Sequence, residues 1–143
     1  MPDVIALLET DHREVEDLFA KAEDNTGAAK AQVVAKIATE LTLHAEVEES
    51  LVYPAMREAG LDDMVDEAEQ EHQQMKELVA QLQAADGASS EVDGIVAELK
   101  ANVVHHVEEE EGEVFPKFRA SVDQSTLDGL GERVEAAKAR ANA

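Results

Sequence analysis

The chain contains no cysteine and no tryptophan, and its other aromatic residues are one tyrosine and three phenylalanines. Without cysteine there are no disulfides, thiolate nucleophiles or sulfur-ligated metal sites, so nitrogen and oxygen atoms must hold any metal. Basic residues are scarce: 12 Lys and Arg stand against 33 Asp and Glu, a formal net charge of −21. Such a surface repels phosphate backbones and anionic lipid headgroups, which predicts no binding to nucleic acid or membranes.

Long hydrophobic runs are also missing. No apolar stretch approaches the roughly 18 residues that a membrane span needs. The N-terminus carries Asp3 and no basic segment before an apolar run, unlike a signal peptide. We therefore expect a soluble cytoplasmic protein, and the length of 143 residues predicts one domain.

Apolar residues recur at steps of three and four along most of the chain, the pattern of helices with one buried face. Turn residues divide this pattern into four long helices within about residues 3–120 and a shorter helix over about 125–141. Pro54 is expected to kink the second helix near its end, and Pro116 to kink or end the fourth. These features predict an all-α, up-down-up-down four-helix bundle with a short C-terminal fifth helix, in a single domain over 1–143.

Polar residues interrupt the buried face of each long helix. The first and third helices each place a histidine there, and the second and fourth each place a histidine and, one turn later, a glutamate. These six residues are His12, His44, Glu48, His72, His106 and Glu110. After Glu48, steps of three and four continue the buried face through Leu51 and Ala55. In an antiparallel bundle all six polar side chains reach roughly one level.

Two buried carboxylates need compensating positive charge, because an isolated ionised carboxylate in an apolar core is very unfavourable. The only basic side chain near this level is Lys76, and one ammonium cannot balance two carboxylates. Four imidazoles and two carboxylates suit a pair of first-row transition metal ions better than zinc, calcium or magnesium. The alternative is a metal-free polar network that fixes the register of the helices.

The second and fourth helices share the pattern H-x3-E-E-x4-P, over residues 44–54 and 106–116. With His12 and His72 added, the chain resembles the hemerythrin-like (HHE) cation-binding domain family over about residues 3–120. This resemblance implies two iron ions in a carboxylate-bridged, non-heme di-iron centre, with an oxo or hydroxo bridge when oxidised.

The resemblance also implies a role for each of the six residues. Glu48 and Glu110 correspond to the bridging carboxylates. One iron is bound by His12 and His44, and the other by His72 and His106. The remaining acids in the runs Glu46–Glu49 and Glu108–Glu111 are expected to lie mostly on a solvated face.

Three further residues lie near these positions. His105 also has a glutamate four residues later, but only His106 keeps the distance to the proline seen in the first repeat. His105 is therefore expected on the helix flank, next to the ligands, and a place among the ligands is the alternative. Oxygen-carrying hemerythrins have a further histidine where this chain has Lys76, which leaves one iron short of a nitrogen. Tyr53, matched by Phe115 in the second repeat, is either a packing aromatic or a residue that contacts the centre.

The resemblance implies reaction with dioxygen, hydrogen peroxide or nitric oxide, as a carrier, a sensor or a peroxide-decomposing enzyme. Because Lys76 replaces a histidine, we expect catalase-like decomposition of peroxide rather than reversible oxygen carriage. Iron storage or sensing without turnover is the alternative, and a purely structural bundle is the third hypothesis. The sequence shows no nucleotide-binding loop or serine triad, and it identifies no redox partner.

Overall fold

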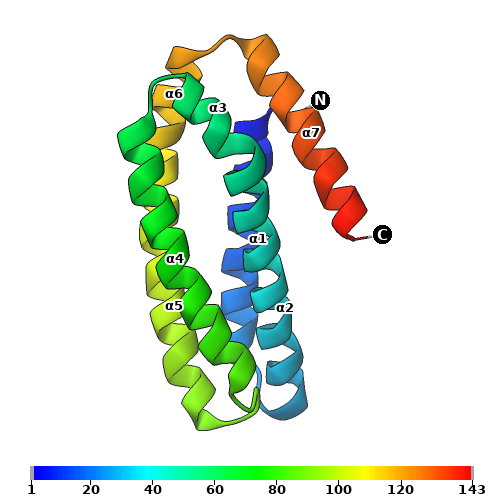
Figure 1. The fold of residues 1–143 in the computed structure, drawn as a ribbon. Helices are drawn as coiled ribbons and strands as arrows, with labels where there is room; N and C mark the ends of the chain where they lie inside the picture. The colour runs from blue at the N-terminus through cyan, green and yellow to red at the C-terminus, as the bar shows by residue number, and fades with distance from the viewer. Residues whose placement is uncertain (1, 143) are drawn as a thin grey trace.

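The structure is a computed structural model that describes residues 2–142, and within that range it contains helices and no strands. In chain order the elements are α1 (Val4–Asp24), α2 (Gly27–Val47), η1 (Glu48–Val52), α3 (Tyr53–Glu58), α4 (Asp62–Ala84), α5 (Ser90–Glu109), η2 (Glu110–Val114), α6 (Phe115–Ser121) and α7 (Gln124–Ala141). Four antiparallel rods form the bundle: α1, α2 continued through η1 and α3, α4, and α5 continued through η2 and α6 (Figure 1). The predicted four-helix bundle with a C-terminal fifth helix is confirmed.

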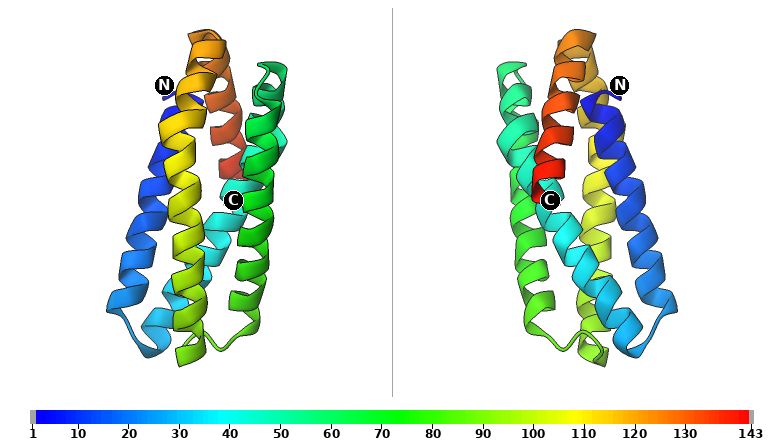
Figure 2. Two further views of the ribbon diagram at one scale, coloured as in Figure 1. Left: turned by 90° about the vertical axis from the view of Figure 1, so that its left-hand side faces the viewer. Right: turned by 90° about the vertical axis from the view of Figure 1, so that its right-hand side faces the viewer.

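The fifth helix, α7, packs along the side of the bundle in one half of its length (Figure 1). It contacts α1, α2 and η1 and lies at the end where the chain begins (Figure 2). Within the part of the chain described, no helix is long and apolar enough to cross a bilayer.

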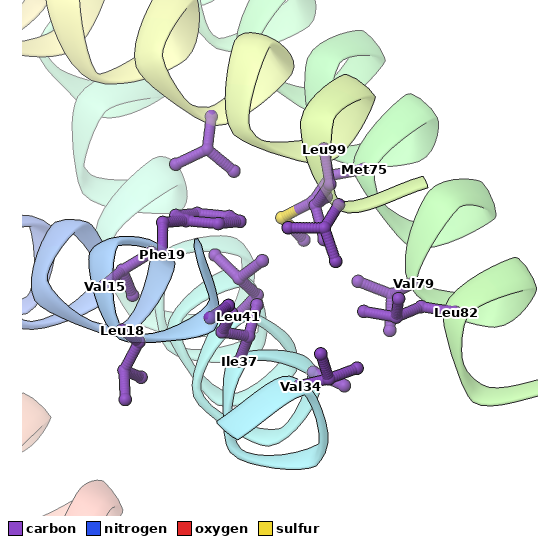
Figure 3. Packing of buried hydrophobic residues seen from close by; sticks show 14 of the residues in the cluster. Val15, Leu18, Phe19, Val34, Ile37, Leu41, Met75, Val79, Leu82 and Leu99 are labelled. Carbon is purple, nitrogen blue, oxygen red and sulfur yellow. The ribbon is translucent and has the colours of Figure 1, made fainter. Parts of the chain in front are cut away.

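The apolar core consists of two clusters. One lies towards the α1–α2 and α4–α5 turns and is built around Phe19, Ile37 and Leu99 (Figure 3). The other lies towards α7 and is built around Leu8 and Phe118. Burying these side chains gives the bundle most of its stability, at about 25 cal/mol per Å² of apolar surface. A layer of polar residues occupies the core between the two clusters.

The helices that carry prolines contain a π-helical turn just before each proline. The backbone N–H of Tyr53 donates to the carbonyl of Glu48, and that of Phe115 donates to the carbonyl of Glu110, five residues back in each case. In a regular α-helix a proline ring clashes with the carbonyl four residues earlier, and the wider π turn relieves this contact. The bends expected at Pro54 and Pro116 thus take the form of η1 and η2.

A π turn inserts one residue, so every later side chain turns by about 100° relative to a continuous α-helix. The predicted continuation of the buried face through Leu51 and Ala55 is therefore wrong by one residue. Val52 and Met56 are the buried positions, at 0% and 1% exposure, whereas Leu51 and Ala55 are half-buried.

Candidate metal centre

The structure brings the six predicted ligand residues together in the polar layer at mid-height of the bundle. All are buried, with exposed fractions of 0% for Glu48, 1% for Glu110 and at most 8% for the histidines. Their ligand atoms form two groups, each within 4.8 Å. The groups are His12, His44 and Glu110, and Glu48, His72 and His106.

Each glutamate lies between histidines of both groups. Glu48 Oε1 is 3.0 Å from His44 Nε2 and 3.1 Å from His72 Nε2. Glu110 Oε1 is 3.2 Å from His12 Nε2, and Glu110 Oε2 is 3.4 Å from His106 Nε2. This is the placement that a carboxylate needs to join two neighbouring ions.

Several inward-facing atoms have no hydrogen-bond partner among the described residues, although they lie close together. They are His12 Nε2, His44 Nε2, Glu48 Oε2, His106 Nε2 and Glu110 Oε1. Buried polar atoms in proteins are nearly always paired, so five unpaired atoms around one point indicate a missing ligand. A set of imidazole nitrogens and carboxylate oxygens fits first-row transition metal ions.

The outer nitrogen of each histidine faces a carboxylate. An ionised carboxylate only accepts hydrogen bonds, so each Nδ1–H donates and each Nε2 is left to face the centre. The four pairs are His12 with Glu111 (2.6 Å), His44 with Asp11 (2.9 Å), His72 with Glu49 (2.8 Å) and His106 with Glu71 (2.7 Å). Such partners fix the orientation of metal-binding histidines.

A cationic or imidazole group faces each of these carboxylates from outside. The contacts are Arg13 with Glu111 (2.5 Å), Lys138 with Asp11, Lys76 with Glu49 (2.7 Å) and His105 with Glu71 (3.4 Å). Lys76 is 45% exposed and reaches the centre only through Glu49 and His72. His105 is 65% exposed and lies on the helix flank, where the sequence places it.

Sequence reasoning missed the four carboxylate partners. Glu49 and Glu111 were expected on a solvated face, but each is half-buried and bonds a histidine. The repeat holds the signal that identifies them, because an acid precedes His12 and His72 and a second glutamate follows Glu48 and Glu110.

Tyr53 lies against the centre as well as in the core. Its hydroxyl donates to Glu110 Oε2 at 3.1 Å and lies 3.2 Å from His72 Nε2. In a continuous α-helix Tyr53 would lie about 180° from His44, and the residue inserted by η1 turns it inward. Phe115, its counterpart after η2, stacks on His12 with ring centroids 6.0 Å apart.

Charges within the layer stabilise one another in the metal-free protein. Burial lowers the pKa of His44, but the Glu48 charge and the hydrogen bond to Asp11 outweigh it and raise that pKa to about 10. The pKa of His106 is likewise raised well above its usual value despite burial, chiefly by Glu110. For Glu48, burial is outweighed by the charge of His44, which holds the pKa well below its usual range.

A small cavity adjoins the four histidines on the side of the α1–α2 turn. Its volume is about 20 Å³, and the rest of its wall is formed by Asp11, Asn102 and apolar side chains, among them Leu41, Met75 and Val103. A cavity needs about 10–15 Å³ to hold one water molecule, so this space suits a ligand of one or two heavy atoms.

A four-helix bundle with inward histidines and glutamates defines a metal-binding helical protein. Residues 3–118 match the family described as "Hemerythrin HHE cation binding domain". The chain therefore belongs to the hemerythrin HHE cation-binding domain family.

Two known proteins are similar to this chain. A hemerythrin HHE cation binding domain-containing protein from Mycobacterium kansasii has a crystal structure with a TM-score of 0.83 and 22% identity, covering 95% of this chain and 85% of that one. A protein named "DNA nickase" from Nostoc sp. (strain PCC 7120 / SAG 25.82 / UTEX 2576) is 30% identical over 139 residues, 96% of this chain. The chain spans 39% of the length of that relative.

Proposed function

We propose that the chain binds two iron ions among the six buried residues and uses them to decompose hydrogen peroxide. The observation that carries the proposal is the group of five unpaired buried atoms contributed by histidines and glutamates from three of the four rods. We assign His12 and His44 to one ion, His72 and His106 to the other, and Glu48 and Glu110 as bridges.

Bound iron would supply the change of oxidation state and an open position for a small oxidant. The protein residues supply the rest. The four Nδ1 hydrogen bonds hold the imidazoles in place, and the 20 Å³ cavity excludes bulky organic substrates. Tyr53 holds a proton at its hydroxyl next to Glu110 and His72, where it could be donated to a departing oxygen.

Peroxide decomposition is favoured over reversible oxygen carriage by what surrounds His72. Lys76 occupies the position one turn after His72 at which oxygen-carrying hemerythrins have a further histidine, and its ammonium group donates to Glu49. Beside His72 Nε2 lie the Glu48 carboxylate and the Tyr53 hydroxyl, and the hydroxyl is a proton donor. Iron storage or sensing is the second candidate, favoured if the bound iron proves inert to peroxide.

DNA nicking, the activity in the name of the Nostoc relative, is not part of the proposal. The chain spans 39% of that protein. The net charge of −21 on the present chain also opposes its approach to a phosphate backbone.

We expect the iron-loaded, oxidised protein to convert two molecules of hydrogen peroxide into two of water and one of dioxygen. An oxygen electrode measures this reaction, with metal-free protein and an equal concentration of free iron as controls. Oxygen evolution no faster than with free iron would contradict peroxide decomposition. Retention of two ions per chain in the same samples would then favour storage or sensing.

Tyr53→Phe tests whether the phenol is a ligand or a hydrogen-bond donor. We expect the variant to retain two ions, because the six histidine and glutamate ligands remain. The metal-free variant should lose about 1.5–3 kcal/mol of unfolding free energy in urea, the usual worth of a buried hydrogen bond to a charged group. Loss of one ion per chain would show instead that the Tyr53 oxygen binds iron.

A further inference from the structure

A second group of potential ligands lies outside the centre, on the seam between α4 and α5. Glu71, His105 and Glu109 present one ligand atom each, all within 4.8 Å of one another. His105 Nε2 is 2.9 Å from Glu109 Oε1 and 3.4 Å from Glu71 Oε2. Unlike the central residues, this group reaches the surface, since His105 is 65% exposed and Glu109 29%.

This group is joined to the centre by contacts and by sequence. One oxygen of Glu71 accepts a hydrogen bond from His106 Nδ1 at 2.7 Å, and the other faces His105. His105 and Glu109 directly precede the ligand residues His106 and Glu110 along α5.

A cavity of about 40 Å³ lies along the same seam. Its outer wall carries Glu67, Glu71, Glu109 and Glu113, and no lysine or arginine lines it. Glu110 and His106, which are 1% and 7% exposed, also line it, and each has an inward atom without a hydrogen-bond partner. The cavity thus runs from a carboxylate-rich surface to the buried ligands.

Of the polar groups on this seam, the equivalent seam in the other half of the bundle keeps only the counterpart of Glu71, which is Asp11. Counted from the ligand histidines, the equivalents of Glu67, His105, Glu109 and Glu113 are Leu7, Leu43, Val47 and Leu51. These apolar residues belong to the cluster that α7 covers. The two halves of the bundle carry matching ligand residues, but the residues between these ligands and the surface differ. The polar seam is therefore a specific feature of the α4–α5 side.

We propose that Glu71, His105 and Glu109 form an outer site that captures a divalent transition metal ion and passes it through the α4–α5 cavity to the buried centre. The identity of the ion as iron rests on the proposed function. Imidazole and carboxylate are suitable ligands for such an ion, and a cleft lined by one sign of charge raises the local concentration of the opposite charge.

The test is the rate of ferrous ion uptake by metal-free protein, followed anaerobically by stopped-flow and by final iron content. In a protein carrying both His105→Ala and Glu109→Gln, uptake should slow by about tenfold, within the range of electrostatic focusing. The final content should still be two ions per chain, because the six buried ligands are intact. The matched control is Glu108→Gln, which removes the same charge from an exposed neighbour that does not line the cavity.

Mn²⁺ provides a second measurement. Mn²⁺ is titrated into iron-loaded protein, and the electron paramagnetic resonance signal of unbound Mn²⁺ is measured. The titration should reveal one additional binding site, which the double variant lacks and the Glu108→Gln variant keeps. Equal uptake rates in the double variant and the control, or equal Mn²⁺ binding, would overturn the outer site. Failure of the unmodified protein to take up iron would instead refute the proposed iron centre.

Discussion

His106→Ala should lose at least one of the two proposed iron ions, whereas His105→Ala should keep both. His106 is buried and its Nε2 faces both Glu110 and Glu48, while His105 points to Glu71 and Glu109 on the surface. Loss of an outer hydrogen-bond partner of a ligand typically costs 10–100-fold in metal affinity, and loss of the ligand itself should cost more. Iron per chain after anaerobic reconstitution and desalting measures the difference.

The glutamates provide an independent form of the same test. Glu110→Ala should lose the spectrum of a bridged iron pair, and Glu109→Ala, one residue away on the flank, should keep it. Circular dichroism of each metal-free variant shows whether the bundle is still folded. Equal iron loss in His105→Ala and His106→Ala would mean that the helix register is wrong at this level.

The helices and the six central residues could be predicted because both depend on local periodicity. From the N-terminus of each rod to Glu48 and Glu110, the backbone is regular α-helix, so steps of three and four follow the buried face correctly. The prediction fails after Glu48, where η1 inserts a residue and moves burial from Leu51 to Val52. Pro54 marks the irregularity but does not reveal on which side of it the extra residue lies.

The contacts around the centre could not be predicted from one helix at a time. Glu111 lies on the fourth rod and its partner His12 on the first, so their hydrogen bond depends on how the rods pack. Lys76 was placed by its spacing from His72 alone, yet the facing carboxylate of Glu49 draws it away from the centre. Tyr53 faces the centre only because η1 rotates it.

A large effect is also expected on the thermal stability of the protein. Metal loading should raise the melting temperature of the protein by on the order of 20 °C. An ion present at 1,000 times its dissociation constant stabilises the folded state by about 4.1 kcal/mol per site. Two such sites give about 8 kcal/mol, and each kcal/mol raises the melting temperature of a protein of this size by about 2–4 °C or slightly more. Calorimetry with and without ferrous ion, under anaerobic conditions, measures the shift.

The size of that shift should increase from about pH 5 to pH 8, because metal and protons compete for the same nitrogens. In the metal-free protein the pKa of His44 is about 10 against a usual 6.5, so its stabilising contribution is complete below pH 6.5 and is lost as pH rises through 10. The lowered pKa of Glu48 contributes stability above its usual 4.5, which is lost only as pH falls through the depressed value. The metal-free protein therefore loses stability on the alkaline side, where deprotonated imidazoles bind metal best.

Proton release gives this competition a direct readout. At pH 7 His44 is protonated in the metal-free protein, since its pKa is raised to about 10, and the pKa of His106 is raised as well. An imidazole must be neutral to bind iron, so loading should release at least one proton per chain into a weakly buffered indicator solution. The His105→Ala variant, which keeps both ligand histidines, serves as the control and should release the same number. A melting shift that is independent of pH, together with no proton release, would show that iron does not bind through these histidines.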